Sequence, residues 1–230
     1  MRHAPSPNHG PRQGRARPSL VVLHYTAMAS AEAALTRLCD PAVEVSAHYL
    51  IGGAGEIWAL VPEDRRAWHA GAGAWGGIAD VNSHAIGIEL DNCGARPFPN
   101  RQITALEALL DDVMQRWSIL PHGVVAHSDV APTRKRDPGP RFDWRRLARG
   151  GRSVWAEGAP DPPGGSGSGL PDPARFHRAA RQFGYRCAPG QAAALLDAFR
   201  LRFRPWAGGV LTPADISTIE VLAARWPGPA

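Results

Sequence analysis

Short hydrophobic runs, each bounded by glycine, proline or polar residues, recur through the first two thirds of the chain. They cover residues 20–24, 48–51, 57–60, 85–90 and 124–127. Runs of this length between turn-forming residues are typical of buried β-strands.

A different spacing lies between the last two of these runs. Hydrophobic side chains recur there at steps of three and four residues, at Ile103, Leu106, Leu109, Leu110, Val113 and Trp117. This spacing predicts a helix with one face on a core. Together the patterns predict an α/β domain with a sheet covered by helices. His24, Glu89 and His127 would then lie at or near strand ends, where side chains from different strands can converge on one cleft.

Glycine, proline and serine dominate residues 157–171, and hydrophobic side chains almost vanish there. Such a segment cannot bury enough surface to order itself, so it is predicted to be a linker. The chain divides accordingly into a basic N-terminal arm (1–18), a large domain (19–156), the linker (157–171) and a small domain (172–230).

The small domain contains three amphipathic stretches, at 176–183, 195–203 and 216–223. Gly184 punctuates the first joint, and Thr212 followed by Pro213 has the pattern of an N-cap and a first helical turn. We expect a compact three-helix domain. It is either a binding module or a stabilising appendage without a ligand.

Composition adds limits on partners and location. The net charge of +5 comes from dispersed arginines without a nucleic-acid motif, so no nucleic-acid partner is expected. Such a charge favours anionic partners in general but is also typical of an arginine-rich proteome, so it does not decide the function. Cys39, Cys93 and Cys187 are far apart and lack a metal-ligand spacing, which indicates free thiols. No run approaches the roughly 20 apolar residues of a membrane span, so no membrane insertion is expected. The first twenty residues do not make a signal peptide, which favours a cytoplasmic location; a leader outside this sequence would favour the periplasm. A monomer is the default expectation.

Five polar residues make a candidate hydrolytic metal site. Catalytic zinc usually takes three protein ligands and keeps one position for water, and His24, His127 and Asp137 would suffice. Glu89 is a candidate to take a proton from water and pass it to a leaving nitrogen. Lys135 is a candidate to stabilise a developing oxyanion.

Other interpretations stay open for these residues. Glu89 interrupts an apolar strand, where an unpaired carboxylate is costly to bury, so a buried salt bridge is its alternative role. Lys135 lies in a basic loop and is alternatively a solvated cation. Asp129 either orients a ligand histidine or caps a helix. Trp68 is as compatible with a core aromatic as with a sugar platform.

The motifs themselves resemble a known family. They are Val-Leu-His-Tyr-Thr-Ala (22–27), Val-Ser-Ala-His-Tyr-Leu-Ile (45–51), Ala-Trp-His-Ala-Gly (67–71), Ile-Gly-Ile-Glu-Leu-Asp-Asn (86–92), Val-Ala-His (125–127) and Arg-Lys-Arg-Asp-Pro-Gly-Pro (134–140). The set resembles the zinc-dependent N-acetylmuramoyl-L-alanine amidases of the type-2 amidase family. It is most similar to the two-domain branch with a C-terminal peptidoglycan-binding-like helical domain.

The resemblance implies a mixed central β-sheet flanked by helices, the fold shared by type-2 amidases and peptidoglycan recognition proteins. It also implies zinc held by His24, His127 and Asp137, with Glu89 as acid/base and Lys135 as stabiliser of the transition state. In addition, it places three residues in the substrate cleft: Trp68, His69 and Asn92.

The same resemblance implies the reaction and the substrates. The bond cut would join N-acetylmuramic acid, including its 1,6-anhydro form, to the L-alanine of the stem peptide, and the partners would be peptidoglycan fragments or muropeptides. Ala47 and Asp137 stand where phage-type relatives carry tyrosine and cysteine, which points to the bacterial branch that uses glutamate. The alternative is a recognition protein that binds muropeptide without cleaving it. Such relatives typically lose a metal ligand, whereas this chain keeps the full set.

Overall fold

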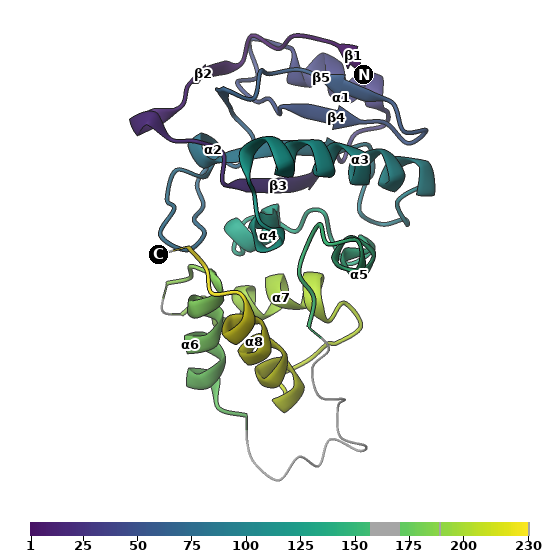
Figure 1. Cartoon of the computed structure of the whole chain (residues 1–230). Coiled ribbons are helices and arrows are strands. Elements are labelled where there is room, and N and C mark those ends of the chain that lie inside the picture. The colour runs from purple at the N-terminus through teal and green to yellow at the C-terminus, as the bar shows by residue number, and fades with distance from the viewer. Residues whose placement is uncertain (157–170, 189, 230) are drawn as a thin grey trace.

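The computed structural model describes residues 1–156, 171–188 and 190–229. A unit built around a β-sheet lies above a helical unit, and the short helices α4 (His127–Val130) and α5 (Trp144–Arg149) lie where the units meet (Figure 1). The predicted linker lies outside the described residues, apart from Pro171.

The main sheet has six strands in the order β1-β5-β4-β7-β3-β8. Their bounds are Arg2–His3 (β1), Leu20–Tyr25 (β3), Tyr49–Ile51 (β4), Ile57–Ala59 (β5), Ala85–Leu90 (β7) and Val124–Ala126 (β8). Within this sheet, as far as the structure describes it, β4 and β5 form the antiparallel pair and the other neighbours pair parallel, so the prediction of a mixed sheet is confirmed. The central strand β3 pairs parallel with both β7 and β8, and its register places His24 beside Glu89.

Side-chain alternation along β3 separates two cores. Val21 and Leu23 face the long helix α3 (Asn100–Trp117), whose predicted hydrophobic stripe is buried on that side of the sheet. Leu20 and Val22 face the opposite side, toward the helical unit. Because successive side chains in a strand point to opposite faces, His24 lies on the side of the helical unit. The candidate site residue His24 therefore lies on the face of the sheet that α3 does not cover.

The predicted basic arm is built into the fold. β1 extends the main sheet, and β2 (His9–Pro11) pairs antiparallel with β6 (Arg65–Ala67), a strand that the hydrophobic pattern did not predict. After a 3-10 turn at Gln13–Arg15, the chain enters β3. Arg12 anchors the arm by donating to the carbonyls of Glu63, Ser83 and Ala85.

Several short helices complete the sheet-containing unit. They are α1 (Ala31–Leu38), α2 (Val81–His84), a 3-10 turn at Pro121–Gly123, α4 (His127–Val130) and α5 (Trp144–Arg149). α1 begins at the cap Ser30, whose side chain accepts from Ala33 N, and it packs on Leu50 and Trp58. His127, expected at or near a strand end, is the first residue of α4 and directly follows β8.

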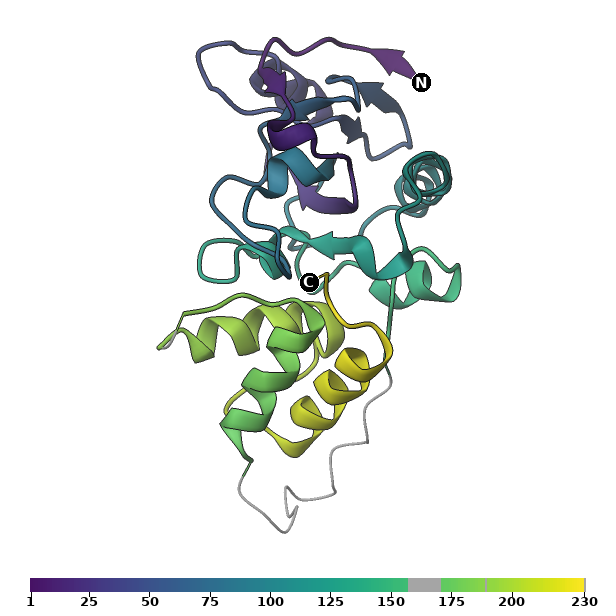
Figure 2. The ribbon, with the colours of Figure 1, turned by 60° about the vertical axis from the view of Figure 1, so that its left-hand side comes forward.

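The helical unit contains the three predicted helices: α6 (Pro173–Phe183), α7 (Ala192–Phe203) and α8 (Pro213–Arg225). Thr212 caps α8 and Pro213 occupies its first turn, as expected. Figure 2 shows α6 and α8 side by side, with α7 facing the sheet-containing unit. The aromatic residues of α6 and α7 belong to the same hydrophobic cluster as Val22, Trp75 and Val130. The two units therefore share one core.

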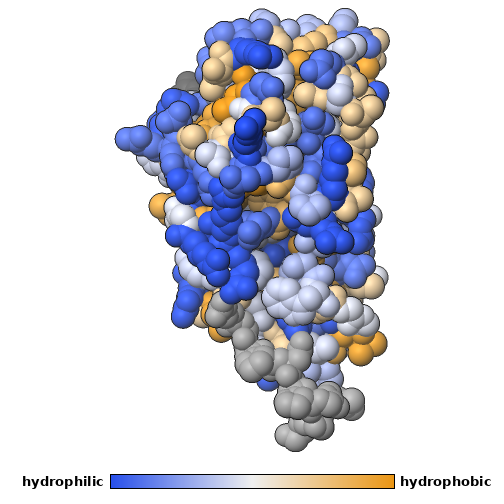
Figure 3. Space-filling view, turned by 90° about the vertical axis from the view of Figure 1, so that its right-hand side faces the viewer, coloured by the Kyte–Doolittle hydropathy of each residue, from blue (hydrophilic) through white to orange (hydrophobic). Residues whose placement is uncertain are grey.

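Hydrophilic side chains dominate the face shown in Figure 3, and the hydrophobic areas on it are small. Among the described residues, the exposed large hydrophobic residues are Met1, Leu120, Trp206 and Val210. Met1 and Leu120 are far from the others in the sequence, whereas Trp206 and Val210 are four positions apart. Across the described ranges, none of the helices has the length and apolar character needed to cross a bilayer.

Candidate active site

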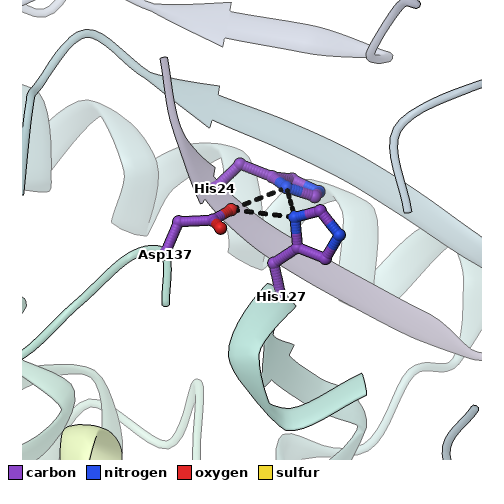
Figure 4. A group of neighbouring side chains, drawn as sticks. All are labelled: His24, His127 and Asp137. Carbon is purple, nitrogen blue, oxygen red and sulfur yellow. Dashed lines mark hydrogen bonds and ion pairs between the residues drawn. The ribbon is translucent and has the colours of Figure 1, made fainter. Parts of the chain in front are cut away.

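Three polar atoms from distant parts of the chain converge on one point (Figure 4). His24 Nδ1 lies 2.9 Å from His127 Nδ1 and 3.1 Å from Asp137 Oδ2, and His127 Nδ1 lies 2.9 Å from the same oxygen. β3 supplies His24, the first turn of α4 supplies His127, and the loop after α4 supplies Asp137. All three residues are buried.

Hydrogen bonds on the far side of each imidazole set the direction of its lone pair. His127 Nε2 lies 3.0 Å from the carbonyl oxygen of Ala70, an acceptor, so we assign the proton to Nε2 and the lone pair to Nδ1. His24 Nε2 lies 3.1 Å from His69 Nδ1, which allows the same arrangement for His24. Two imidazole lone pairs and a carboxylate oxygen then face one another. Such a group is electrostatically unfavourable unless a cation lies between its members.

The donor set fits zinc. Imidazole nitrogen and carboxylate oxygen are both zinc ligands, and three ligands of a tetrahedral ion at about 2.0–2.1 Å lie about 3.3 Å from one another. The observed separations of 2.9–3.1 Å need only a small expansion. Among the described residues, these three form the group of histidine and carboxylate side chains placed to hold a metal ion.

The charge states of the group suit a cation. Burial, with repulsion from His127, lowers the pKa of His24 to about 4 against the pull of Asp137. Burial alone would raise the pKa of Asp137, but the imidazoles of His127 and His24, whose Nδ1 atoms lie close to its Oδ2, outweigh burial and hold that pKa well below its ordinary value. At neutral pH His24 is therefore unprotonated and Asp137 is ionised, the forms that bind metal.

Glu89 lies beside this group on β7, opposite His24 in the strand register. Burial raises its pKa to about 8; Asp137 adds to the rise, whereas Lys135 opposes it. Glu89 Oε2 is buried and has no hydrogen-bond partner among the described residues. The alternative of a buried salt bridge is thus not what the structure describes. A carboxyl group with a pKa near neutrality can both accept and donate a proton.

Lys135 lines the cavity together with the group of three and Glu89. It is also the only lysine in a chain that has 26 basic residues of the lysine and arginine types. This is a further signal in the sequence for a special role of position 135, because arginine is the residue at every other lysine or arginine position. A lysine is a compact, mobile point charge rather than a planar fork.

A cavity of about 450 Å³ opens above these residues. Its further lining comes from Tyr25, Thr26, Ala27, Met28, Ala34, Arg37, Leu38, Val45, Ser46, Trp68, His69, Arg134 and Arg136. Trp68 and His69, which the resemblance implied as cleft residues, are among the residues that line this cavity, and His69 also contacts His24. The arginines give the lining positive charge, which suits carboxylate groups.

Asn92 is the sequence-predicted site residue that the structure does not bring to this cavity. It is fully buried, and its side-chain oxygen accepts from Gly94 N at 2.8 Å. Its amide nitrogen lies 3.4 Å from the carbonyl oxygen of Pro97. These contacts close the loop after β7 and leave the side chain turned into that loop.

Two further buried residues support the site. His48 Nδ1 accepts from Gly87 N at 2.9 Å and its Nε2 lies 3.1 Å from Arg65 O, so His48 joins β7 to β6. Asp129 Oδ2 accepts from Ala126 N at 2.8 Å, which caps the turn that begins with His127. Of the two alternatives for Asp129, the structure shows the helix cap, and the capped turn begins with the ligand candidate His127.

Comparisons with known proteins identify the family. A family model described as N-acetylmuramoyl-L-alanine amidase matches residues 14–140. The N-acetylmuramoyl-L-alanine amidase AmiD of Escherichia coli (strain K12) is 37% identical over 216 residues, which cover 81% of this chain and 75% of that protein.

Solved structures agree with this match. The E. coli AmiD complex with the substrate anhydro-N-acetylmuramic acid-L-Ala-D-gamma-Glu-L-Lys has a TM-score of 0.80 and 32% identity, and covers 95% of this chain and 98% of its own. AmpDh3 of Pseudomonas aeruginosa in complex with anhydromuramic pentapeptide has a TM-score of 0.82 and 33% identity, covering 94% and 95%.

The chain therefore belongs to the N-acetylmuramoyl-L-alanine amidase family. The predictions of an amidase and of its mixed α/β fold are confirmed.

Proposed function

We propose that the protein is a zinc-dependent amidase that cuts the amide bond between N-acetylmuramic acid and the L-alanine of a stem peptide, in peptidoglycan turnover or recycling. The observation that carries the proposal is the convergence of His24 Nδ1, His127 Nδ1 and Asp137 Oδ2 beside Glu89 at a cavity. Family membership supports the reaction, and the donor chemistry supports the metal.

His24, His127 and Asp137 would hold the zinc ion. When bound, zinc polarises a carbonyl group and acidifies a water molecule, and its charge lowers the pKa of a neighbouring carboxyl group. Glu89 takes the proton from water as the water oxygen attacks the carbonyl carbon. Lys135 supplies positive charge near the developing oxyanion.

Glu89 then returns this proton to the nitrogen of L-alanine as the carbon–nitrogen bond breaks. The products are a free lactyl carboxyl group on the sugar and a stem peptide with a free amino group. Burial keeps the proton affinity of Glu89 high enough for this return step, because its pKa is raised to about 8 before any cation is added.

The expected substrates are muropeptides or other peptidoglycan fragments, including the 1,6-anhydro form. The arginines of the cavity lining, Arg37, Arg134 and Arg136, suit the carboxylates of a stem peptide. Trp68 offers an aromatic surface for the sugar. A cytoplasmic location would favour recycled anhydro-muropeptides, whereas a periplasmic one would favour the polymer or its fragments. Fractionation of the host, with both substrates compared side by side, separates these possibilities.

The direct test is incubation with an anhydro-muropeptide, with mass spectrometry to follow free stem peptide. We expect release by the zinc-loaded protein, loss of release after chelation, and recovery when zinc is returned. Glu89→Gln should bind zinc but release about 10²- to 10⁴-fold less peptide, the usual contribution of a general acid/base. The surface variant Glu220→Gln should behave as wild type. Release by chelated Glu89→Gln protein would exclude the mechanism.

The alternative, a protein that recognises muropeptides without cleaving them, predicts binding and no release under any of these conditions. A monomer is proposed for either function, and light scattering at working concentrations measures it.

A further inference from the structure

Asp129 is fully buried two residues after His127, and three donors surround its carboxylate. Ala126 N donates to Oδ2 at 2.8 Å and caps the turn. Tyr185 donates its hydroxyl to Oδ1 at 2.6 Å, and Arg202 pairs with Oδ2 at 2.5 Å. Two of the three donors thus come from the helical unit.

Arg202 joins more than one element of the amidase unit. Its Nη2 donates to the carbonyl of Val124 at 2.9 Å and to Ser153 Oγ at 3.2 Å. Its guanidinium lies over the ring of Trp144, with Cζ 4.3 Å from the ring centroid. Arg202 therefore links the start of β8, the turn of α4 and α5 from a side chain with 0% exposure.

The other support of His127 is also held by the helical unit. The carbonyl of Ala70, which faces His127 Nε2, begins a loop that reaches Gly76. Gly76 N donates to Gly184 O at 2.7 Å, and Arg186 Nε donates back to Gly76 O at 2.5 Å. Segment 184–186 thus fixes this loop, while Tyr185 between its ends reaches Asp129.

Because Asp129 is buried, loss of any one of its contacts is costly. Removing one partner of a buried ion pair leaves an uncompensated charge, and the surroundings then shift or admit water. Burial, with the charge of Asp129, raises the pKa of Tyr185 well above its ordinary value, so its hydroxyl keeps the proton that it donates. A metal ligand must be held within about 0.5 Å of its productive position, so a shift of this turn would reach His127.

We propose that the helical unit is a positioning element of the amidase site. Arg202 and Tyr185 hold Asp129, and through it the turn that presents His127 Nδ1 to His24 and Asp137. This inference rests on the proposed role of His127 as a zinc ligand. It gives the helical unit a task within the site itself, separate from any ligand of its own.

The chain offers matched controls. Arg200 is a second buried arginine of α7, and it pairs with buried Asp215 at the same distance of 2.5 Å but inside the helical unit. Tyr49 donates to Glu63 at 2.6 Å, as Tyr185 does to Asp129. We would compare Arg202→Met with Arg200→Met, and Tyr185→Phe with Tyr49→Phe, in the full-length protein.

The readouts are the zinc dissociation constant by competition with a chromophoric chelator, the absorption spectrum of the cobalt-substituted protein, and the free energy of unfolding. Both arginine variants should lose stability. Only Arg202→Met should bind zinc more weakly, by about 10- to 100-fold, with a changed cobalt spectrum. Tyr185→Phe should weaken zinc binding about two- to tenfold. Arg200→Met and Tyr49→Phe should keep the wild-type affinity within a factor of about two.

Unchanged zinc affinity in Arg202→Met and Tyr185→Phe would overturn the inference, as would an equal loss in the control variants. If an arginine variant does not fold, the tyrosine pair decides alone. A wild-type protein that binds no zinc would overturn the proposed function and this inference with it. A wild type that binds zinc, beside Arg202→Met with equal affinity, would overturn only the inference.

Discussion

Replacing Trp75 with alanine tests whether the two units unfold as one. Trp75 belongs to the loop between β6 and α2 in the sheet-containing unit, and it is 1% exposed. Its ring meets those of Phe183 and Tyr185 edge-on, with centroids 5.5 Å and 5.1 Å away. The side chain thus fills the place where the helical unit joins the amidase unit.

The expected cost follows from the size and burial of the indole. A buried tryptophan truncated to alanine typically costs about 3–5 kcal/mol, because hydrophobic transfer and an unfilled cavity both contribute. Each kcal/mol lowers the melting temperature of a chain of this length by about 2–4 °C. We therefore expect Trp75→Ala to melt roughly 6–20 °C below wild type.

Calorimetry and circular dichroism measure this shift and the number of transitions. Because both units belong to one hydrophobic cluster, a single transition is expected, and it should move as a whole. Trp206→Ala is the control: Trp206 is 65% exposed, so its removal should change stability by less than about 0.5 kcal/mol. Two transitions, with the amidase unit melting at the wild-type temperature, would refute a shared core.

Further predictions concern the site. An amine-selective acylating reagent should inactivate the enzyme through Lys135, its only lysine. A bound muropeptide should slow this loss of activity. Inactivation that persists unchanged in Lys135→Arg would implicate the terminal amine instead. His69→Ala should weaken zinc binding about 10- to 100-fold, because His69 orients His24. Trp68→Ala should affect KM alone. Equal zinc affinities of the two variants, measured by chelator competition, would contradict this prediction. In zinc-free protein, Glu89 holds a proton between its ordinary pKa of 4.5 and its folded pKa of about 8, so the folded state binds more protons there. The free energy of unfolding of wild type, relative to Glu89→Gln, should therefore fall by a few kcal/mol as pH rises through that window; denaturant titrations that show a constant difference would argue against a buried Glu89.

The hydrophobic pattern predicted those elements that can be recognised from their own residues, without knowledge of their neighbours in the fold. β3, β7 and α3 carry enough successive core positions for their periodicity to stand out, and the caps of α8 are local. β1, β2 and β6 have two or three residues each and contain arginine, histidine and proline. Strands this short carry no alternation, so only their hydrogen-bonded neighbours define them.

The contacts that join the two units could not be predicted from the sequence either, because they link residues that are far apart along the chain. Arg202 lies 73 positions after Asp129, and Tyr185 lies 56 positions after it. In the sequence Arg202 belongs to a run in which hydrophobic and basic residues alternate (199–204), and this pattern does not define which of the arginines is exposed to solvent. The glycine- and proline-rich segment before Arg202 suggests that the helical unit is separate from the sheet-containing unit, although the helices of that unit pack against the sheet-containing unit. Which arginine is buried depends on that tertiary packing.

Strand register gives the site its strongest physical constraint. His24 on β3 and Glu89 on β7 are direct neighbours in a parallel pair, and both replace a hydrophobic residue on the face that α3 does not cover. A slip of one residue in either strand would turn its polar side chain into the core beneath α3 and its hydrophobic neighbours toward the cavity. Burying an unpaired carboxyl or imidazole in that core costs several kcal/mol, so the slipped pairing is unstable. The alternation that builds the sheet therefore also places His24 and Glu89 of the proposed site side by side, and this is why two polar residues in hydrophobic strands stand out in the sequence.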